Sequence, residues 1–142
     1  MPHIFVYGSL LFPELLTALT GNSFIYSPAI LYGFKRFRVK GCDFPAIIEE
    51  TRSKTEGLLI ENVDEKSMEI LSFFEGDEYR EEKVTIFISD KEITAITFIW
   101  GADKSLLVNR DWDANEFKNK SLDYYLDKVV PETLVAFRSQ HS

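Results

Sequence analysis

The sequence predicts an α+β fold built on a largely closed sheet with a few helices. Short β-rich runs separated by turns dominate the first hundred residues, and only a few segments have helical periodicity. The 142 residues contain no repeat, low-complexity tract or linker, and this length suits one domain. We therefore expect a single domain over residues 1–142, with C-terminal helices from about residue 113.

The first part of the chain is expected to form a strand, a helix and a second strand. His3–Tyr7 is short, apolar and β-rich, which indicates a buried strand. Phe12–Leu19 has a helical pattern, and Pro13 is tolerated in a first helical turn. Pro28 interrupts the run Phe24–Leu31, so this segment indicates an edge or irregular strand.

The middle of the chain is expected to contain three short strands followed by a helix. Phe34–Lys40 alternates apolar and basic residues, which is typical of a half-exposed strand. Ala46–Glu49 and Gly57–Glu61 indicate two further strands. The next segment has helical spacing, with Asp64 as its N-cap and Gly76 at its end.

The last third is expected to contain a hairpin and then helices. Val84–Ser89 and Ile93–Trp100 are β-rich runs on either side of a three-residue polar turn. From Asp113 onward the pattern is helical, and a glutamate three residues later resembles a capping box. Pro131 is expected to break this helical region into two helices.

Charge and composition exclude several classes of function. The chain has 16 basic and 23 acidic residues, a net charge of −7, so nucleic acid is not an expected partner. Its single cysteine excludes an internal disulfide framework and a cysteine-rich zinc site. His3 and His141 lie at opposite ends of the chain, which disfavours a histidine-based triad or metal site. Carboxylates, backbone amides, hydroxyls and phenols remain for chemistry.

The expected location is cytoplasmic, with no membrane partner. No uninterrupted apolar run reaches the ~18 residues of a membrane span. The first residues also lack the charge and cleavage pattern of a signal peptide.

The first candidate site is the segment Tyr7-Gly8-Ser9-Leu10, which links a predicted strand to a helix. A loop in this position can direct backbone N–H groups at an anion, and Gly8 permits close approach of a ligand. The segment lacks the pattern of a phosphate-binding P-loop. Taken alone, these four residues are better explained by a simple tight turn between strand and helix.

The second candidate site is an acidic segment around Glu75, at the predicted end of a helix and beside two phenylalanines. The helix dipole, neighbouring carboxylates and an apolar wall would each raise the pKa of this carboxyl group. A carboxyl group with a pKa near neutrality suits general acid–base catalysis. A solvated acidic turn is the alternative interpretation, and the segment has no recognisable spacing of metal ligands.

Other conspicuous residues have simpler interpretations. The basic and aromatic residues of segment 34–40 could indicate RNA binding, but a solvated strand face explains their alternation. Cys42 is expected to be a small, buried or half-buried residue. Core packing is the expected role of Trp100, Trp112, Tyr124 and Tyr125.

Taken together, the order and spacing of several segments resemble the gamma-glutamylcyclotransferase-like superfamily, most closely its avirulence-induced-gene-like branch. The likeness extends from about residue 3 to about residue 130. The segments that carry it are Phe5–Leu10, Gly33–Phe34, Arg36–Phe37, Lys40–Gly41, Phe44–Ile47, Glu56–Leu59, Phe74–Tyr79, Val84, Trp112–Asp113 and Glu116–Phe117.

This resemblance implies a small mixed β-barrel with flanking helices. It implies an enzyme in which the substrate's α-amine attacks its own γ-carbonyl and releases 5-oxoproline and a free amine. Glu75 would transfer the protons as general acid/base. The implied partner is a small-molecule γ-glutamyl substrate, without cofactor or metal, bound to a monomer or weak homodimer. By position, the implied substrate-binding residues are Tyr7, Gly8, Ser9, Leu10 and Tyr79.

One departure from the family pattern keeps a second function open. The family has an arginine two residues after the tyrosine, whereas here Arg80 comes one position early and Glu81 occupies the arginine position. A shift of one residue on a strand moves a side chain to the opposite face. A barrel that only binds a γ-glutamyl-like ligand or a protein partner is therefore the alternative.

Overall fold

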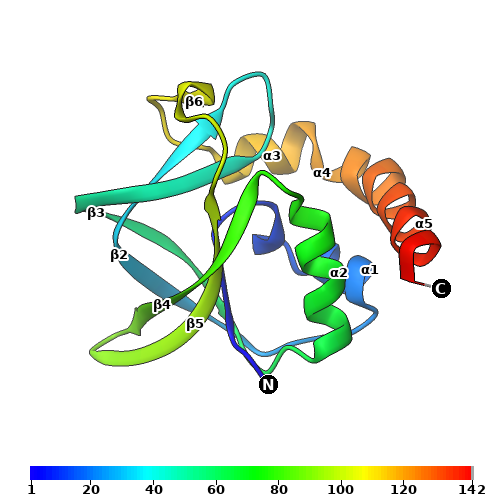
Figure 1. The fold of residues 1–142 in the computed structure, drawn as a ribbon, viewed down its shortest axis with the longest axis horizontal. Coiled ribbons are helices and arrows are strands. Elements are labelled where there is room, and N and C mark those ends of the chain that lie inside the picture. The colour runs from blue at the N-terminus through cyan, green and yellow to red at the C-terminus, as the bar shows by residue number, and fades with distance from the viewer. Residues whose placement is uncertain (142) are drawn as a thin grey trace.

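A single sheet of six strands closes into a barrel (Figure 1). In the computed structural model, which describes residues 1–141, the strand order is β3-β1-β5-β4-β2-β6, and β3 also pairs with β2. This additional pairing closes a ring of five strands, and β6 extends the sheet beside β2. β1 runs parallel to β5 and antiparallel to β3, so the barrel is mixed. The strands are β1 (Ile4–Val6), β2 (Tyr26–Val39), β3 (Pro45–Ile60), β4 (Tyr79–Ile88), β5 (Lys91–Trp100) and β6 (Leu107–Val108).

The two longest strands each replace two of the predicted strands. The segments before and after Gly33 form the single strand β2, and those between residues 45 and 60 form the single strand β3. The prediction of separate strands there is wrong. β2 stays paired with β3 on both sides of a register shift at Gly33, where φ is 84°, so the strand continues. Pro28 stays in the ladder opposite Leu58. The polar middle of β3, residues 50–54, is mostly exposed and therefore has no strand-like apolar pattern.

The predicted hairpin is confirmed, with a different turn. Ile88 lies opposite Lys91, so Ser89 and Asp90 alone connect β4 to β5. Ser89 has φ 54°, in the left-handed region that two-residue hairpin turns use. β4 begins at Tyr79, shortly after the acidic segment, and this start places Tyr79 at the mouth of the barrel.

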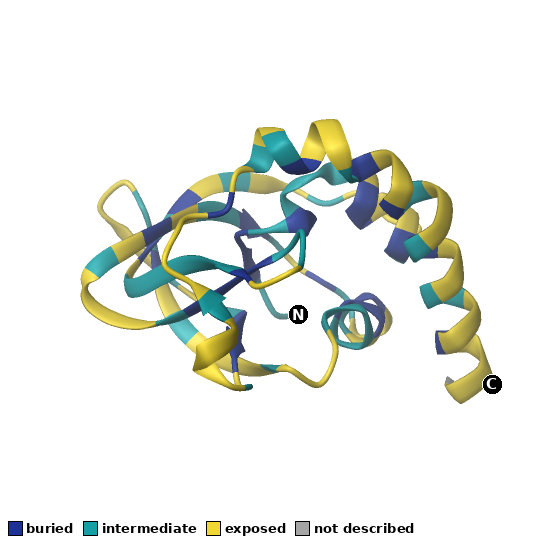
Figure 2. Cartoon of the chain, turned by 90° about the horizontal axis from the view of Figure 1, so that it is seen from above, coloured by how far each residue is buried: buried dark blue, intermediate teal, exposed yellow. Residues whose placement is uncertain are grey.

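Helices cover one end and one side of the barrel (Figure 1). Helices α1, α2 and α5 pack against one another and share an apolar core with the barrel. Figure 2 shows buried residues inside the barrel and on the inner side of these helices. No helix among residues 1–141 has the length and apolar character needed to cross a bilayer. The helical segments are η1 (Ser9–Leu11), α1 (Pro13–Thr20), α2 (Glu65–Glu75), η2 (Lys104–Leu106), α3 (Ala114–Lys120), α4 (Leu122–Tyr124), the π-helical η3 (Tyr125–Val129) and α5 (Val130–His141).

The predicted helix ends agree with the observed caps. The Asp64 side chain accepts a hydrogen bond from the Ser67 amide, and α2 ends at Gly76. Asp113 likewise caps α3 by accepting from the amide of Glu116. The glutamate does not complete a capping box, because its carboxylate pairs with Arg38 on β2.

The predicted break at Pro131 is wrong. The chain remains helical from α4 through α5, and the interruption lies earlier, at Ser121. In a regular α-helix, a proline ring collides with the carbonyl group four residues before it. The wider π-helical turn η3 ends two residues before Pro131 and contains Asp127, the residue four positions before the proline, so it relieves this collision.

Candidate active site

A cavity of about 230 Å³ lies where β1 ends, between the mouth of the barrel and the helices. Its walls come from η1, the β2–β3 loop, the end of α2, the start of β4 and the C-terminal helical segment. The polar and apolar residues that line it include Tyr7, Gly8, Ser9, Leu10, Phe44, Pro45, Phe74, Glu75, Tyr79, Tyr125, Val129 and Thr133. All six residues that the sequence singled out thus face one cavity, although they come from segments almost seventy positions apart.

The turn after β1 contributes backbone to this cavity. A Cβ atom at Gly8 would lie 2.8 Å from Cγ and Cδ of Pro45, so the close approach of these two segments requires glycine. Ser9 and Leu10 begin η1 and are buried. The first amides of a helix have no acceptor within the helix. Among residues 1–141, the amides of Ser9 and Leu10 donate to no other protein group.

Glu75 is the last residue of α2, and its carboxyl group faces the same cavity. Burial raises the pKa of Glu75 to about 7. The sequence suggested two further causes, but burial alone accounts for the shift. The neighbouring carboxylates of Asp77 and Glu78 belong to exposed residues. Within the described part of the chain, no side chain forms a hydrogen bond with the carboxyl group of Glu75.

Two tyrosines of the cavity use their hydroxyl groups to hold backbone carbonyls. Tyr79 donates to the carbonyl oxygen of Pro45 at 2.6 Å, and Tyr7 donates to that of Phe98 at 2.5 Å. Burial raises the pKa of both phenols above the ordinary value, and the nearby Glu75 raises it further. Both phenols therefore remain neutral donors, and their rings form fixed walls of the cavity.

The departure from the family pattern lies outside the cavity. Arg80 is exposed and pairs with Glu82 at 3.2 Å. Glu81, in the family's arginine position, accepts a hydrogen bond from the Ser72 hydroxyl on α2. Glu81 thus connects β4 to the helix that carries Glu75, and neither Arg80 nor Glu81 lines the cavity.

Several cavity residues were not identified from the sequence. The predicted packing role is incomplete for Tyr125, because its hydroxyl donates to Asp43 at 2.7 Å and its ring lines the cavity. The packing role is wrong for Tyr124, which is 60% exposed. The spacing of Tyr125, Val129 and Thr133 is the signal that could have found this wall, since residues four apart share a helix face.

The basic strand 34–40 is also less solvated than predicted. The side chains of Arg36 and Arg38 are only 19% and 20% exposed. Arg36 pairs with Asp111 at 2.7 Å, and Arg38 pairs with Glu116 at 3.3 Å. Both arginines therefore have carboxylate partners within the fold. No group of three or more potential metal-ligating side chains comes together among residues 1–141.

Comparison with known proteins places this architecture in a family. Residues 4–114 match the model of the family described as gamma-glutamyl cyclotransferase, AIG2-like. The chain belongs to this family. AIG2-like protein D of Arabidopsis thaliana is 29% identical over 129 residues, which cover 89% of this chain and 85% of that protein. AIG2-like protein A of the same plant is 30% identical over 122 residues, which cover 82% and 72%.

Solved structures share the cyclotransferase-like fold. A solution structure of an Arabidopsis thaliana protein, 26% identical, superposes with a TM-score of 0.69 and covers 90% of this chain and 87% of that one. A structure titled gamma-glutamyl cyclotransferase, 16% identical, has a TM-score of 0.58 and covers 89% and 84%. The predicted mixed barrel with flanking helices is therefore confirmed.

Proposed function

We propose that the protein is a gamma-glutamyl cyclotransferase that releases 5-oxoproline from a small γ-glutamyl compound. The observation that carries this proposal is one cavity bordered by Glu75, whose pKa is raised to about 7, and by the amide-rich turn around Gly8. Membership of the family described as gamma-glutamyl cyclotransferase, AIG2-like, supports this class of reaction.

The reaction needs no nucleophile from the protein. The substrate's α-ammonium group first loses a proton to Glu75, and the resulting amine attacks the γ-carbonyl carbon. A new C–N bond closes the five-membered ring, and the bond to the departing amine breaks as Glu75 returns the proton to that amine. The ring nitrogen gives up the second proton of the attacking amine, which passes through Glu75 to the released amine, so the products are the neutral lactam and an ammonium ion. Because both reacting groups belong to one molecule, holding them in position can contribute on the order of 7–11 kcal/mol.

Glu75 suits both proton transfers. With a pKa of about 7, the carboxyl group is partly ionised and partly protonated near neutral pH, so one residue can accept and then donate. Its side chain has no competing partner among the described residues. The substrate's amine can therefore approach it directly.

The turn around Gly8 supplies donors for a negatively charged group. In this proposal its amides stabilise either the oxyanion that develops on the γ-carbonyl or the substrate's α-carboxylate. The rings of Tyr7 and Tyr79 form walls of the site, and their hydroxyl groups keep their hydrogen bonds to the backbone carbonyls described above.

The first prediction tests Glu75. We expect Glu75→Gln to lower kcat for 5-oxoproline release by about 10²–10⁴, the usual contribution of general acid–base catalysis. The measurement is 5-oxoproline formed from a panel of glutathione, γ-glutamyl amino acids, γ-glutamylamines and γ-glutamyl-lysine. Asp77→Asn is the matched control, because Asp77 is exposed in the same acidic segment.

The results separate the two functions. A folded Glu75→Gln protein that keeps the wild-type rate would refute the role of Glu75. If the wild-type protein binds members of the panel saturably in calorimetry but forms no 5-oxoproline, the barrel is a binding module instead.

A further inference from the structure

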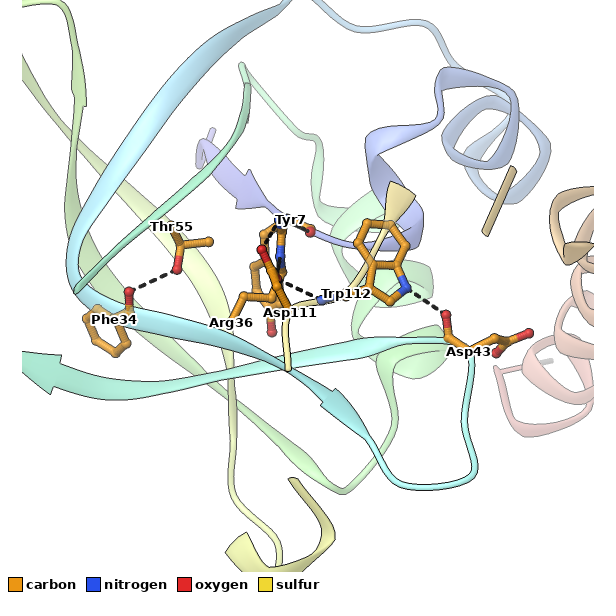
Figure 3. A network of polar contacts seen from close by, with 7 residues as sticks. All are labelled: Tyr7, Phe34, Arg36, Asp43, Thr55, Asp111 and Trp112. Atoms are coloured by element: carbon orange, nitrogen blue, oxygen red, sulfur yellow. Dashed lines mark hydrogen bonds and ion pairs between the residues drawn. The ribbon is translucent and has the colours of Figure 1, made fainter. Parts of the chain in front are cut away.

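Arg36 reaches from β2 to the backbone just before the turn around Gly8. Its Nη1 donates to the Tyr7 carbonyl oxygen at 2.9 Å. Its Nε and Nη2 donate to the two carboxylate oxygens of Asp111 at 2.7 and 3.3 Å (Figure 3). The guanidinium group also lies over the ring of Trp112, 5.6 Å from the ring centre. A planar group held in this way has little freedom, so Arg36 fixes the carbonyl that it binds.

The geometry of the peptide bond transmits this constraint to Gly8. The Tyr7–Gly8 peptide is trans, so the Tyr7 carbonyl and the Gly8 N–H point in opposite directions. Gly8 lines the cavity, whereas Arg36 does not. Holding the carbonyl toward Arg36 therefore points the N–H of Gly8, a residue of the cavity wall, away from Arg36. Among the residues that the structure describes, the Gly8 amide donates to no protein acceptor.

The bond from Arg36 also makes the Gly8 amide a stronger donor. Hydrogen bonds from a charged group are stronger than neutral ones, and hydrogen bonds in series polarise one another. The positive guanidinium draws electron density toward the Tyr7 oxygen, which leaves more positive charge on the amide hydrogen across the same peptide. An anionic group in the cavity would gain from both the direction and the polarity of this amide.

The same network supports the neighbouring part of the cavity wall. Asp111 accepts from the Trp112 amide at 2.7 Å, and the Trp112 indole donates to the carbonyl oxygen of Asp43 at 2.7 Å (Figure 3). Asp43 directly precedes Phe44 and Pro45, which line the cavity. The turn around Gly8 and the adjacent wall at Phe44 and Pro45 therefore share one set of polar contacts with Arg36.

We propose that Arg36 is a positioning residue that directs the Gly8 amide toward the anionic group of the ligand. Its effect on catalysis rests on the proposed cyclotransferase function, whereas its effect on the Gly8 amide does not. Arg36 does not touch the ligand in this proposal. It acts through the Tyr7–Gly8 peptide.

The chain offers a closely matched control for the test. Arg38 lies two residues along the same strand, is equally buried and also pairs with a carboxylate, but its hydrogen bonds go to Glu116 and not to Tyr7. We compare Arg36→Gln, Arg36→Lys and Arg38→Gln. Each arginine-to-glutamine change removes one ion pair made by a largely buried arginine, and Arg36→Lys keeps a cation that can still donate to the Tyr7 carbonyl.

The first readout is independent of turnover. In ¹⁵N–¹H spectra, we expect the Gly8 amide resonance to move in Arg36→Gln, to return toward its wild-type position in Arg36→Lys and to stay in place in Arg38→Gln. By calorimetry, we expect Arg36→Gln to bind 5-oxoproline about tenfold more weakly, the value of one hydrogen bond. An unchanged Gly8 resonance together with unchanged binding would overturn the proposal, even if the wild-type protein is not an enzyme.

The second readout is kcat/KM for 5-oxoproline release. We expect kcat/KM to fall by a factor of about 10–10² in Arg36→Gln, because a small misplacement of a group that contacts the substrate lowers the rate by factors of this size. Arg38→Gln should lose comparable stability without this loss. Equal losses in the two variants would mean that Arg36 is only structural and would overturn the proposal. If Arg36→Gln does not fold, Asp111→Asn replaces it, because the loss of the ion pair loosens the guanidinium and so weakens its hold on the Tyr7 carbonyl.

Discussion

At the scale of single residues, burial distinguishes Glu75 from the other acidic residues of its segment. Asp77 and Glu78 are exposed, whereas Glu75 turns into the cavity beside Phe74. Burial penalises the charged form of a carboxyl group, and its pKa therefore rises to about 7. This short segment thus contains the solvated carboxylates of Asp77 and Glu78 next to the buried, weakly acidic carboxyl group of Glu75.

The second prediction concerns the pH dependence of stability that this weak acid causes. The pKa of Glu75 is about 7 in the folded protein and near its ordinary value of 4.5 in the unfolded chain. At pH values between these two pKa values, Glu75 holds a proton in the folded protein but not in the unfolded chain. The stability that this proton contributes is therefore complete at low pH and is lost as pH rises. The difference between the two pKa values corresponds to about 3 kcal/mol in the free energy of unfolding.

Urea unfolding of the wild-type protein and Glu75→Gln measures this effect. Relative to the variant, the wild-type free energy of unfolding should fall between about pH 4.5 and pH 7. Asp77→Asn should follow the wild-type curve in this range. A difference between the wild-type protein and Glu75→Gln that stays constant with pH would contradict the raised pKa.

At the scale of elements, the candidate site depends on how closely two connections approach each other. The turn after β1 and the start of β3 meet at Gly8 and Pro45. Pro45 is the first residue of its strand, a position where a missing N–H is tolerated. Its carbonyl oxygen also accepts the bond from Tyr79, so β4 is joined to the same point.

The third prediction follows from this contact. We expect Gly8→Ala to lower the free energy of unfolding by about 1–3 kcal/mol, because the new methyl group collides with the Pro45 ring. In a Pro45→Ala background, the same change should cost clearly less. Gly101→Ala is the control, since a Cβ there meets no atom closer than 3.5 Å. Equal costs of Gly8→Ala in both backgrounds would show that this contact is not the cause.

At the scale of the whole molecule, the cavity is completed by the C-terminal helices. The family match ends at residue 114, but Tyr125, Val129 and Thr133 form one wall of the cavity. The same helices bury Leu122 and Phe137 in the main core, so this wall is part of the folded domain. The barrel and the helical layer therefore meet at the site.

The fourth prediction tests the connection between these two layers. Tyr125→Phe removes the hydrogen bond to the Asp43 carboxylate but keeps the ring contacts with Phe74 and Phe117. We expect a loss of about 1 kcal/mol in the free energy of unfolding, as for one partly exposed bond to a carboxylate. The neighbouring Tyr124→Phe, at an exposed residue, should have almost no effect. Equal effects of the two changes would show that the bond does not stabilise the fold.

The sequence was sufficient for features set by local chemistry. The caps at Asp64 and Asp113, the stop at Gly76 and the hairpin depend on residues close together in the chain. Local patterns failed where tertiary pairing overrides them. Pairing with β3 allows β2 to continue through Pro28 and Gly33. The π-helical turn allows the last helix to continue through Pro131.

The sequence by itself determined the inventory of the site, namely an amide-rich turn at residues 7–10 and a carboxyl group at position 75. Only the tertiary structure decided what these groups can do. Closure of the barrel brings the two segments to one cavity, burial rather than neighbouring charge raises the pKa of Glu75, and Arg36 reaches the Tyr7 carbonyl from a distant strand. Burial and hydrogen-bond direction depend on all surrounding segments at once, and no local pattern of residues contains them.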